Sequence, residues 1–302
     1  MNFKNIGNKI LQNTFTKIIV GMVVVLGFYG LSQYLVNVLL NFTTLSSENI
    51  KLITGVVSSI VALFTYITLY RYYEKREITE LSYKNFLSNI LLGLLIGIIL
   101  QSLTIFVIYL NGGYEIVSIN PILNLIPALT MAFSSSIIEE ILFRGIIFRI
   151  TEEKLGSYIA LLISAVIFGG LHYANPNSTV VAALGLAIQA GVLLGASYIY
   201  ARSLWLPIGI HFAWNFTQSG IYGATVSGYS AEKSWISSEI TGSTWYTGGE
   251  FGPEGSVQAT IFCFIVALMF LYLSRKDNKI IEPIWKRKNK INNSYEIQNQ
   301  NT

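Results

Sequence analysis

The sequence predicts an all-α membrane protein, a polytopic bundle of about eight transmembrane helices with both termini in the cytoplasm. Composition is the first observation behind this prediction: 52% of the 302 residues are hydrophobic and only 12% are charged, about half of the roughly 25% typical of soluble domains. The second is a mean hydropathy of +0.53, which is concentrated in long apolar segments. The third is the placement of the basic residues, which lie between these segments and near the C-terminus.

Eight apolar segments account for the predicted helices. A transmembrane helix needs about 20 largely apolar residues, and the segments that approach this length are 15–40, 52–70, 86–110, 122–150, 155–173, 179–200, 204–219 and 257–274. The first is longer than the apolar core of a signal peptide and lacks a small-residue cleavage site. We therefore expect it to be retained as a membrane span.

The basic residues predict the orientation of this eight-span arrangement. Arg144 falls inside a predicted helix, and of the other lysines and arginines 17 lie on the side of the termini and two on the opposite side. Cytoplasmic loops carry an excess of Lys and Arg, so we expect a multi-pass protein of the cell (plasma) membrane with cytoplasmic termini. The net charge of +4 is then a topology signal, and no nucleic-acid partner is expected.

The chain divides into four predicted parts. Residues 1–126 contain the N-terminal transmembrane helices, 127–219 the helices with most of the intramembrane polar residues, 220–276 an outward loop and the last transmembrane helix, and 277–302 a basic tail expected to be disordered. The outward loop is rich in Gly, Ser, Thr, Trp and Tyr, which is typical of an interfacial lid or belt, and its stretch 247–255 predicts turns. A single cysteine, Cys263, excludes a disulfide framework and a cysteine metal cluster.

Three charged residues lie together in the fourth apolar segment. A charge near the bilayer centre costs about 2.5–3.5 kcal/mol even on insertion scales, yet this segment contains Glu139, Glu140 and Arg144. Glu140 and Arg144 are four apart, so they share a helical face and can pair. Glu139 is rotated by about 100° from Glu140 and is left as a spare carboxylate. Desolvation suits such a group to general-base chemistry, whereas the Glu140–Arg144 pair could also be purely structural.

The only two histidines also lie in apolar segments. His172 ends the sequence Phe168-Gly169-Gly170-Leu171-His172, and His211 shares a helical face with Asn215, four residues later. Polar groups from three helices in an apolar bundle indicate an active site or an ion site, although each histidine could also serve helix packing. The three serines at 134–136 are expected to serve helix packing or hydrogen bonding, and no Gly-x-Ser-Gly sequence supports a serine nucleophile.

The depths of these groups do not agree when they are counted along ideal helices. From the cytoplasmic side, the helical rise places His211 roughly 13 Å deep, and Glu139 and His172 roughly 22–27 Å deep. Helix tilt, or a shorter fifth helix, is needed to bring the three side chains together.

In this order, Glu139-Glu140-x-x-x-Arg144, Phe168-x-x-x-His172 and His211-x-x-x-Asn215 resemble the motifs of the CAAX protease and bacteriocin-processing family, also called the Abi or type II CAAX prenyl endopeptidase family. The resemblance covers about residues 127–215, and the outward stretch 247–255 is similar to one found in bacterial members. It implies a membrane-embedded endopeptidase. Carried over residue by residue, it implies that Glu139 activates water with help from His172, that His211 and Asn215 stabilise the oxyanion, and that Glu140 and Arg144 orient the site.

The resemblance leaves the cofactor open, because members have been described both as metalloproteases and as glutamate-dependent proteases. Glu139, His172 and His211 could supply three zinc ligands and leave a position for water. The His-Glu-x-x-His signature of soluble zincins is absent, and a glutamate base does not require zinc. The expected partners are the lipid bilayer and a peptide or protein substrate at the membrane, while the oligomeric state is not specified.

Two other classes of function compete with the endopeptidase. One is a non-enzymatic membrane partner or bacteriocin-immunity protein, in which the polar cluster only fixes helix packing. The other is an ion-coupled transporter, against which the lack of inverted repeats argues. The Ile-, Asn- and Lys-rich composition indicates a bacterial source, so a prenylated CAAX protein is not the expected substrate. Bacteriocin self-immunity, peptide maturation and regulated proteolysis of a membrane protein are the biological roles left open.

Overall fold

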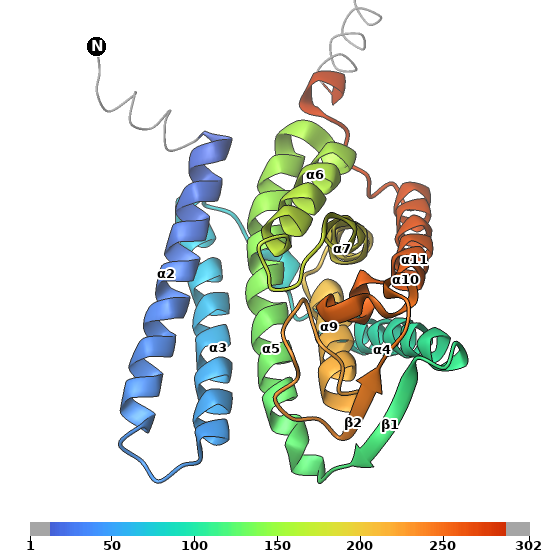
Figure 1. The fold of residues 1–302 in the computed structure, drawn as a ribbon. Helices are drawn as coiled ribbons and strands as arrows, with labels where there is room; N and C mark the ends of the chain where they lie inside the picture. Colours follow the sequence, from blue (N-terminus) through green and yellow to red (C-terminus); the bar gives the residue numbers. More distant parts are fainter. Residues whose placement is uncertain (1–12, 288–302) are drawn as a thin grey trace, which may run out of the picture.

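The computed structural model describes residues 13–287 and shows a bundle of long helices with a small sheet at one end (Figure 1). The long helices are α2 (Thr14–Leu40), α3 (Ser47–Tyr73), α4 (Phe86–Leu110), α5 (Ile126–Glu140), α6 (Arg149–His172) and α11 (Val257–Lys276). The shorter helices α7 (Val180–Leu186), α8 (Leu194–Ala201) and α9 (Trp205–Asn215) complete the bundle. The predicted helical class is confirmed.

All eight predicted segments are helical, but fewer of them qualify as separate spans. Within residues 13–287, six helical runs are long and apolar enough to cross a membrane. One of these, the 51-residue run Ile122–His172, joins two predicted segments. The predicted segment 204–219 forms α9 and the six-residue π-helix η5 (Phe216–Ile221), which together are shorter than the six runs. The chain is a multi-pass membrane protein, while the number eight and the cytoplasmic termini stay predictions.

Gly156 breaks the long run, and the chain after α11 packs at this break. Gly156 has a φ of 78°, in the left-handed region that glycine adopts readily. Ser157 N donates to the Ile281 carbonyl oxygen over 2.9 Å, and Ile281 N donates to Ser157 Oγ over 2.9 Å. Part of the tail that was predicted to be disordered, residues 277–287, is therefore ordered against α6, where these hydrogen bonds satisfy its backbone groups. Residues 288–302 of that tail lie outside the described residues.

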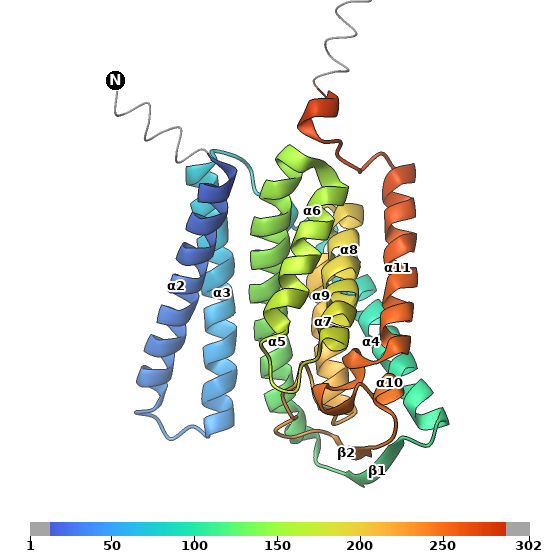
Figure 2. The ribbon, with the colours of Figure 1, turned by 45° about the horizontal axis from the view of Figure 1, so that its top comes forward.

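Helices α2 and α3 form a hairpin that lies beside α5 (Figures 1 and 2). Each begins with a side-chain cap, because Asn13 Oδ1 accepts from Phe15 N over 2.9 Å and Ser46 Oγ accepts from Asn49 N over 3.4 Å. Few residues of α2 are buried, although the helix is strongly apolar. Such a surface belongs against lipid, as expected for a membrane span.

Helices α4 and α9 approach closely at two glycines of α4. A Cβ on Gly93 would lie 2.6 Å from the Leu206 carbonyl oxygen, and a Cβ on Gly97 would lie 2.5 Å from the Ile210 carbonyl oxygen. Small residues four apart let two membrane helices pack backbone to backbone. This contact fixes the position of α9, which bears His211.

A two-stranded antiparallel sheet closes the end of the bundle opposite the start of α2 (Figure 1). It pairs β1 (Tyr114–Ile119) with β2 (Ile236–Ile240), and the register shifts between Ile116 and Ser118. No strand was predicted here, although β1 is rich in the β-branched and aromatic residues that strands favour. The turns predicted for residues 247–255 are confirmed as two short 3₁₀ turns.

Ion pairs join the helices at the other end of the bundle. Glu74 Oε2 lies 2.8 Å from Arg76 Nε and 2.8 Å from Arg149 Nη1, and Glu80 Oε1 lies 2.6 Å from Arg76 Nη2. Burial acts to raise the pKa of both carboxyls, but the adjacent arginines outweigh it and hold both pKa values below the usual range. The pairs therefore tie α3 and the following turn to the start of α6.

Candidate active site

Three π-helical segments surround the polar residues that the sequence singled out. They are η3 (Ile141–Phe148), η4 (Ala187–Leu193) and η5 (Phe216–Ile221). η3 follows Glu140 at the end of α5, and η5 follows Asn215 at the end of α9. π-helical turns are rare and frequently occur at functional sites. Their presence next to two of the three motifs marks this part of the bundle as a candidate site.

Glu140 and Arg144 form the ion pair that their spacing predicts. Arg144 Nη1 donates to Glu140 Oε1 over 2.9 Å, and both side chains are 0% exposed. Arg144 Nη2 donates to the carbonyl oxygens of Ala190 and Gly191 in η4. Glu140 Oε1 also accepts from His211 Nδ1 over 2.9 Å. One buried carboxylate therefore joins α5 to α9, and Arg144 ties both to η4.

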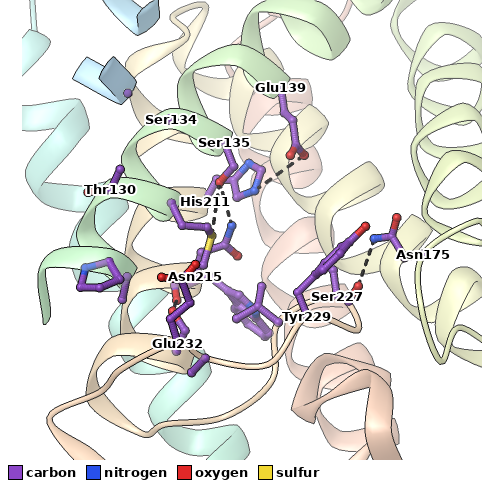
Figure 3. A pocket seen from close by; sticks show the side chains of 18 of the residues that line it. Thr130, Ser134, Ser135, Glu139, Asn175, His211, Asn215, Ser227, Tyr229 and Glu232 are labelled. Atoms are coloured by element: carbon purple, nitrogen blue, oxygen red, sulfur yellow. Dashed lines mark hydrogen bonds and ion pairs between the residues drawn. The ribbon is translucent and has the colours of Figure 1, made fainter. Parts of the chain in front are cut away.

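Glu139 lies beside both imidazole rings, and Figure 3 shows its carboxylate facing His211. Glu139 Oε2 is 3.9 Å from His211 Nε2 and 4.0 Å from His172 Nε2. The Glu139 side chain is 25% exposed, and its Oε2 atom has no hydrogen-bond partner. Glu139 is therefore the spare carboxylate that the sequence predicts, and the three groups meet despite their unequal predicted depths.

Hydrogen bonds on the far side of each ring fix the imidazole tautomers. His172 Nδ1 lies 2.8 Å from the Phe168 carbonyl oxygen, which can only accept, so Nδ1 carries the hydrogen. His211 Nδ1 faces the Glu140 carboxylate in the same way. Phe168 also stacks on the His172 ring, with 4.4 Å between the ring centroids. Each histidine consequently turns its Nε2 atom toward Glu139.

Asn215 lies one helical turn beyond His211, as its spacing predicts. Its Nδ2 atom donates to Ser135 Oγ over 3.2 Å (Figure 3). The serines 134–136 were expected to serve helix packing or hydrogen bonding, and Ser135 does form a hydrogen bond, but its place within the site was not predicted. The signal that could have found it is its position four residues before Glu139, which puts both side chains on one face of α5.

Ser135, Glu139, His172, His211 and Asn215 line a cavity of about 1130 Å³. Its walls include residues of α2, α3, α5, α6, α9 and the outward segment, which we define as residues 220–256, together with residues of α7, η4, α8 and α11. Figure 3 shows Ser227 and Tyr229 of the outward segment across the cavity from the α5 side chains. Small-molecule pockets usually measure about 300–1,000 Å³. This cavity therefore has room for a segment of peptide.

Glu254 is a second carboxyl group in the cavity wall, and it is not among the predicted site residues. It belongs to η7 (Pro253–Gly255) and is 1% exposed. Ser227 Oγ donates to its Oε1 over 2.5 Å, and Gln218 Nε2 donates to its Oε2 over 3.3 Å. Burial raises the pKa of the Glu254 carboxyl above its usual range. The hydrogen bond from Ser227 acts to lower this pKa, but its effect is smaller. No sequence pattern marks this glutamate, because acidic residues in turns are ordinarily exposed.

The separations in the site are wider than those of a zinc centre. Zinc binds histidine nitrogens at about 2.0–2.1 Å and carboxylate oxygens at about 2.0–2.2 Å in tetrahedral geometry, so ligand atoms lie roughly 3.3 Å apart. Glu139 Oε2 is 3.9 and 4.0 Å from the Nε2 atoms of His211 and His172. Among residues 13–287, no group of three or more His, Cys, Asp or Glu is arranged to hold a metal ion. The zinc site considered for these three residues does not fit this arrangement.

The comparison with known families confirms the resemblance that the motifs indicate. Residues 121–217 match the family described as type II CAAX prenyl endopeptidase Rce1-like. The match covers less than half of the chain and includes all six predicted site residues, which are Glu139, Glu140, Arg144, His172, His211 and Asn215. The likeness therefore applies to the helices that form the site.

A curated protein of Bacillus subtilis (strain 168), named "Putative membrane peptidase YdiL", is 37% identical to this chain over 81 residues. The aligned part is 26% of this chain and 30% of the relative, so the likeness spans less than a third of the relative's length. No solved structure matches the chain. The helices that form the site are thus similar to those of membrane peptidases.

Proposed function

We propose that the protein is an endopeptidase of the plasma membrane that hydrolyses a peptide bond with water activated by Glu139. The observation that carries this proposal is the Glu139 carboxylate in a large cavity, facing the Nε2 atoms of His172 and His211 at 4.0 and 3.9 Å. The Oε2 atom of Glu139 is buried and has no hydrogen-bond partner, so this oxygen is free to accept a proton from a nucleophile. The family likeness of residues 121–217 supports the same reaction class.

Glu139 and His172 carry the proton transfers in this mechanism. Separations near 4 Å are too long for a direct hydrogen bond and suit groups that share one water molecule. Glu139 takes a proton from that water molecule while the water oxygen attacks the scissile carbonyl carbon. The Nε2 lone pair of His172, held in place by the Nδ1 bond to Phe168, can then relay the proton to the leaving amine.

His211 and Asn215 stabilise the negative charge on the carbonyl oxygen. Glu140 accepts from His211 Nδ1 and favours the imidazolium form, in which Nε2 is also a donor. Asn215 supplies amide hydrogens from the same face of α9, in a position set by Ser135. A preorganised donor of this kind is typically worth about 3–4 kcal/mol in the transition state. Arg144 neutralises Glu140 and so allows its carboxylate to be buried.

The proposal is tested with the purified protein reconstituted in lipid vesicles. A mixture of synthetic peptides is incubated with the wild type, with Glu139→Gln and with Glu250→Gln, and new peptide termini are identified by mass spectrometry. Glu250 is exposed and outside the cavity lining, so it is the matched control. We expect cleavage by the wild type and Glu250→Gln and none by Glu139→Gln. Equal cleavage by Glu139→Gln would contradict the assignment of the base.

A further inference from the structure

The cavity has a charged mouth at one end of the bundle. Glu48 and Lys51 at the start of α3, and Glu232 and Lys233 in the outward segment, all belong to its lining. Lys51 Nζ lies 2.8 Å from Glu232 Oε1, and Lys233 pairs with Glu48. The Lys51 and Glu232 side chains are 54% and 62% exposed. The mouth therefore reaches the surface at the end of the bundle where β1 and β2 lie (Figure 1).

The cavity is closed on the side away from the mouth, toward the η3 end of the bundle. Immediately behind Glu139, the side chains of Glu140, Arg144 and Ile146 are each 0% exposed, and Phe143 and Phe148 are 5% and 0% exposed. His172 ends α6 and is followed by the loop in which Asn175 Nδ2 donates to the Ser227 carbonyl oxygen over 3.0 Å. Glu139 is therefore reached from the mouth and not through the η3 end of the bundle.

The basic residues are distributed unequally between these two ends. Among residues 13–287, Lys51 and Lys233 are the lysines at the mouth, and each is paired with a glutamate. Apart from Arg144, which is buried inside the bundle, the other basic residues of this range belong to the end at which α2 begins and α11 finishes (Figure 2), and they are Lys17, Arg71, Lys75, Arg76, Lys84, Arg149, Lys154, Arg202, Arg275, Lys276, Lys279, Lys286 and Arg287. An excess of Lys and Arg marks the cytoplasmic side of a membrane protein.

The cavity is open at its mouth and closed toward the η3 end, and most basic residues lie at the end of the bundle away from the mouth. We therefore propose that the cavity opens on the non-cytoplasmic face of the membrane. Its substrates are peptide segments exposed on that face, and cytoplasmic segments are excluded. The statement about substrates rests on the proposed endopeptidase function, whereas the direction of the opening does not. A translocated peptide, or the outer part of another membrane protein, has the required location.

The direction of the opening is tested by labelling single cysteines in intact bacterial cells with a membrane-impermeant maleimide. The starting protein is Cys263→Ala, which removes the chain's one cysteine. Ser230→Cys places a thiol at the exposed mouth, and Lys154→Cys places one at the exposed opposite end. A permeant maleimide must label both variants, which shows that each thiol is accessible in the folded protein. We expect the impermeant reagent to label Ser230→Cys in intact cells and Lys154→Cys only after permeabilisation. The reverse pattern would overturn the proposal.

The aqueous path to the site is tested with Glu139→Cys in the same background. A small anionic methanethiosulfonate reagent should modify this cysteine from outside intact cells, since the Glu139 side chain is 25% exposed to the cavity. Modification only after permeabilisation would show entry from the cytoplasmic side and refute the proposal. Neither labelling result depends on hydrolysis. If labelling follows the expected pattern and no peptide is cleaved, the proposed function fails and the orientation stands.

Discussion

Replacing Glu140 by glutamine should destabilise the protein, because it leaves the Arg144 charge buried without its carboxylate. Glu140 Oε1 accepts from Arg144 Nη1 and from His211 Nδ1, each over 2.9 Å, and Glu140 and Arg144 are both 0% exposed. Hydrogen bonds to a charged group are worth about 1.5–3 kcal/mol each, and breaking a buried pair costs about 3–5 kcal/mol. Glutamine keeps one neutral acceptor, and Arg144 keeps its bonds to Ala190 and Gly191. We therefore expect a loss of about 3 kcal/mol in the free energy of unfolding.

A second substitution separates this effect from a simple loss of packing. In Glu140→Gln/Arg144→Met the buried charge is removed as well, and such replacements are often neutral or stabilising. Most of the lost stability should return in the double variant, while cleavage stays impaired because His211 has lost its charged partner. The assay is reversible unfolding in mixed micelles, followed by tryptophan fluorescence, with exposed Glu250→Gln as control. An unfolding free energy unchanged in Glu140→Gln would refute the buried ion pair.

Three further predictions concern the oxyanion site, the ion pairs near α3 and the α4–α9 contact. Asn215→Ala should lower kcat about 100- to 1,000-fold with little change in KM, as measured by steady-state peptide cleavage. Glu74 and Glu80 have lowered pKa values, so the stability that they contribute is present above their unfolded pKa of about 4.3 and is lost as the pH falls through the folded values. Unfolding curves at decreasing pH should show this loss, and Glu74→Gln/Glu80→Gln should flatten it. Gly97→Val should cost about 1–3 kcal/mol by overpacking, whereas Gly27→Val, where nothing lies within 4 Å of an added Cβ, should leave the melting temperature unchanged.

The sequence predicts the local part of the site well, because spacing within one helix determines which side chains share a face. The Glu140–Arg144 pair and the His211–Asn215 pair follow from four-residue spacings that need no knowledge of the fold. The hydrogen bond between Glu140 and His211 depends on how α5 packs against α9. The position of α9 depends in turn on its close backbone contact with α4, where Gly97 meets Ile210, and periodicity alone does not reveal such a contact.

The unequal depths counted along ideal helices do not keep the site residues apart. Counting helical rise assumes straight and parallel spans that all begin at the membrane surface. The fifth predicted segment is instead broken at Gly156, which has a φ of 78°. Glu139 Oε2 lies 3.9 Å from His211 Nε2 and 4.0 Å from His172 Nε2, so the count along each helix does not give the separation of these groups.

The outward segment was the least predictable part of the chain. Its turns follow from glycines such as Gly248 and Gly252, which have φ values of 76° and 111°. The pairing of β2 with β1 joins residues more than a hundred positions apart in the sequence, so no local pattern specifies it. The burial of Glu254 depends in turn on Ser227 and Gln218, whose positions come from the packed segment.

The central claim is that Glu139 is the base, and the most direct test is the single-turnover rate of peptide cleavage by Glu139→Gln. The isosteric change removes the proton acceptor and keeps the shape of a side chain that is 25% exposed, so the unfolding free energy should stay close to that of the wild type. A general base typically contributes about 100- to 10,000-fold to the rate, and a loss of this size with unchanged peptide binding is the result we predict. A folded Glu139→Gln protein that cleaves at the wild-type rate would contradict the account.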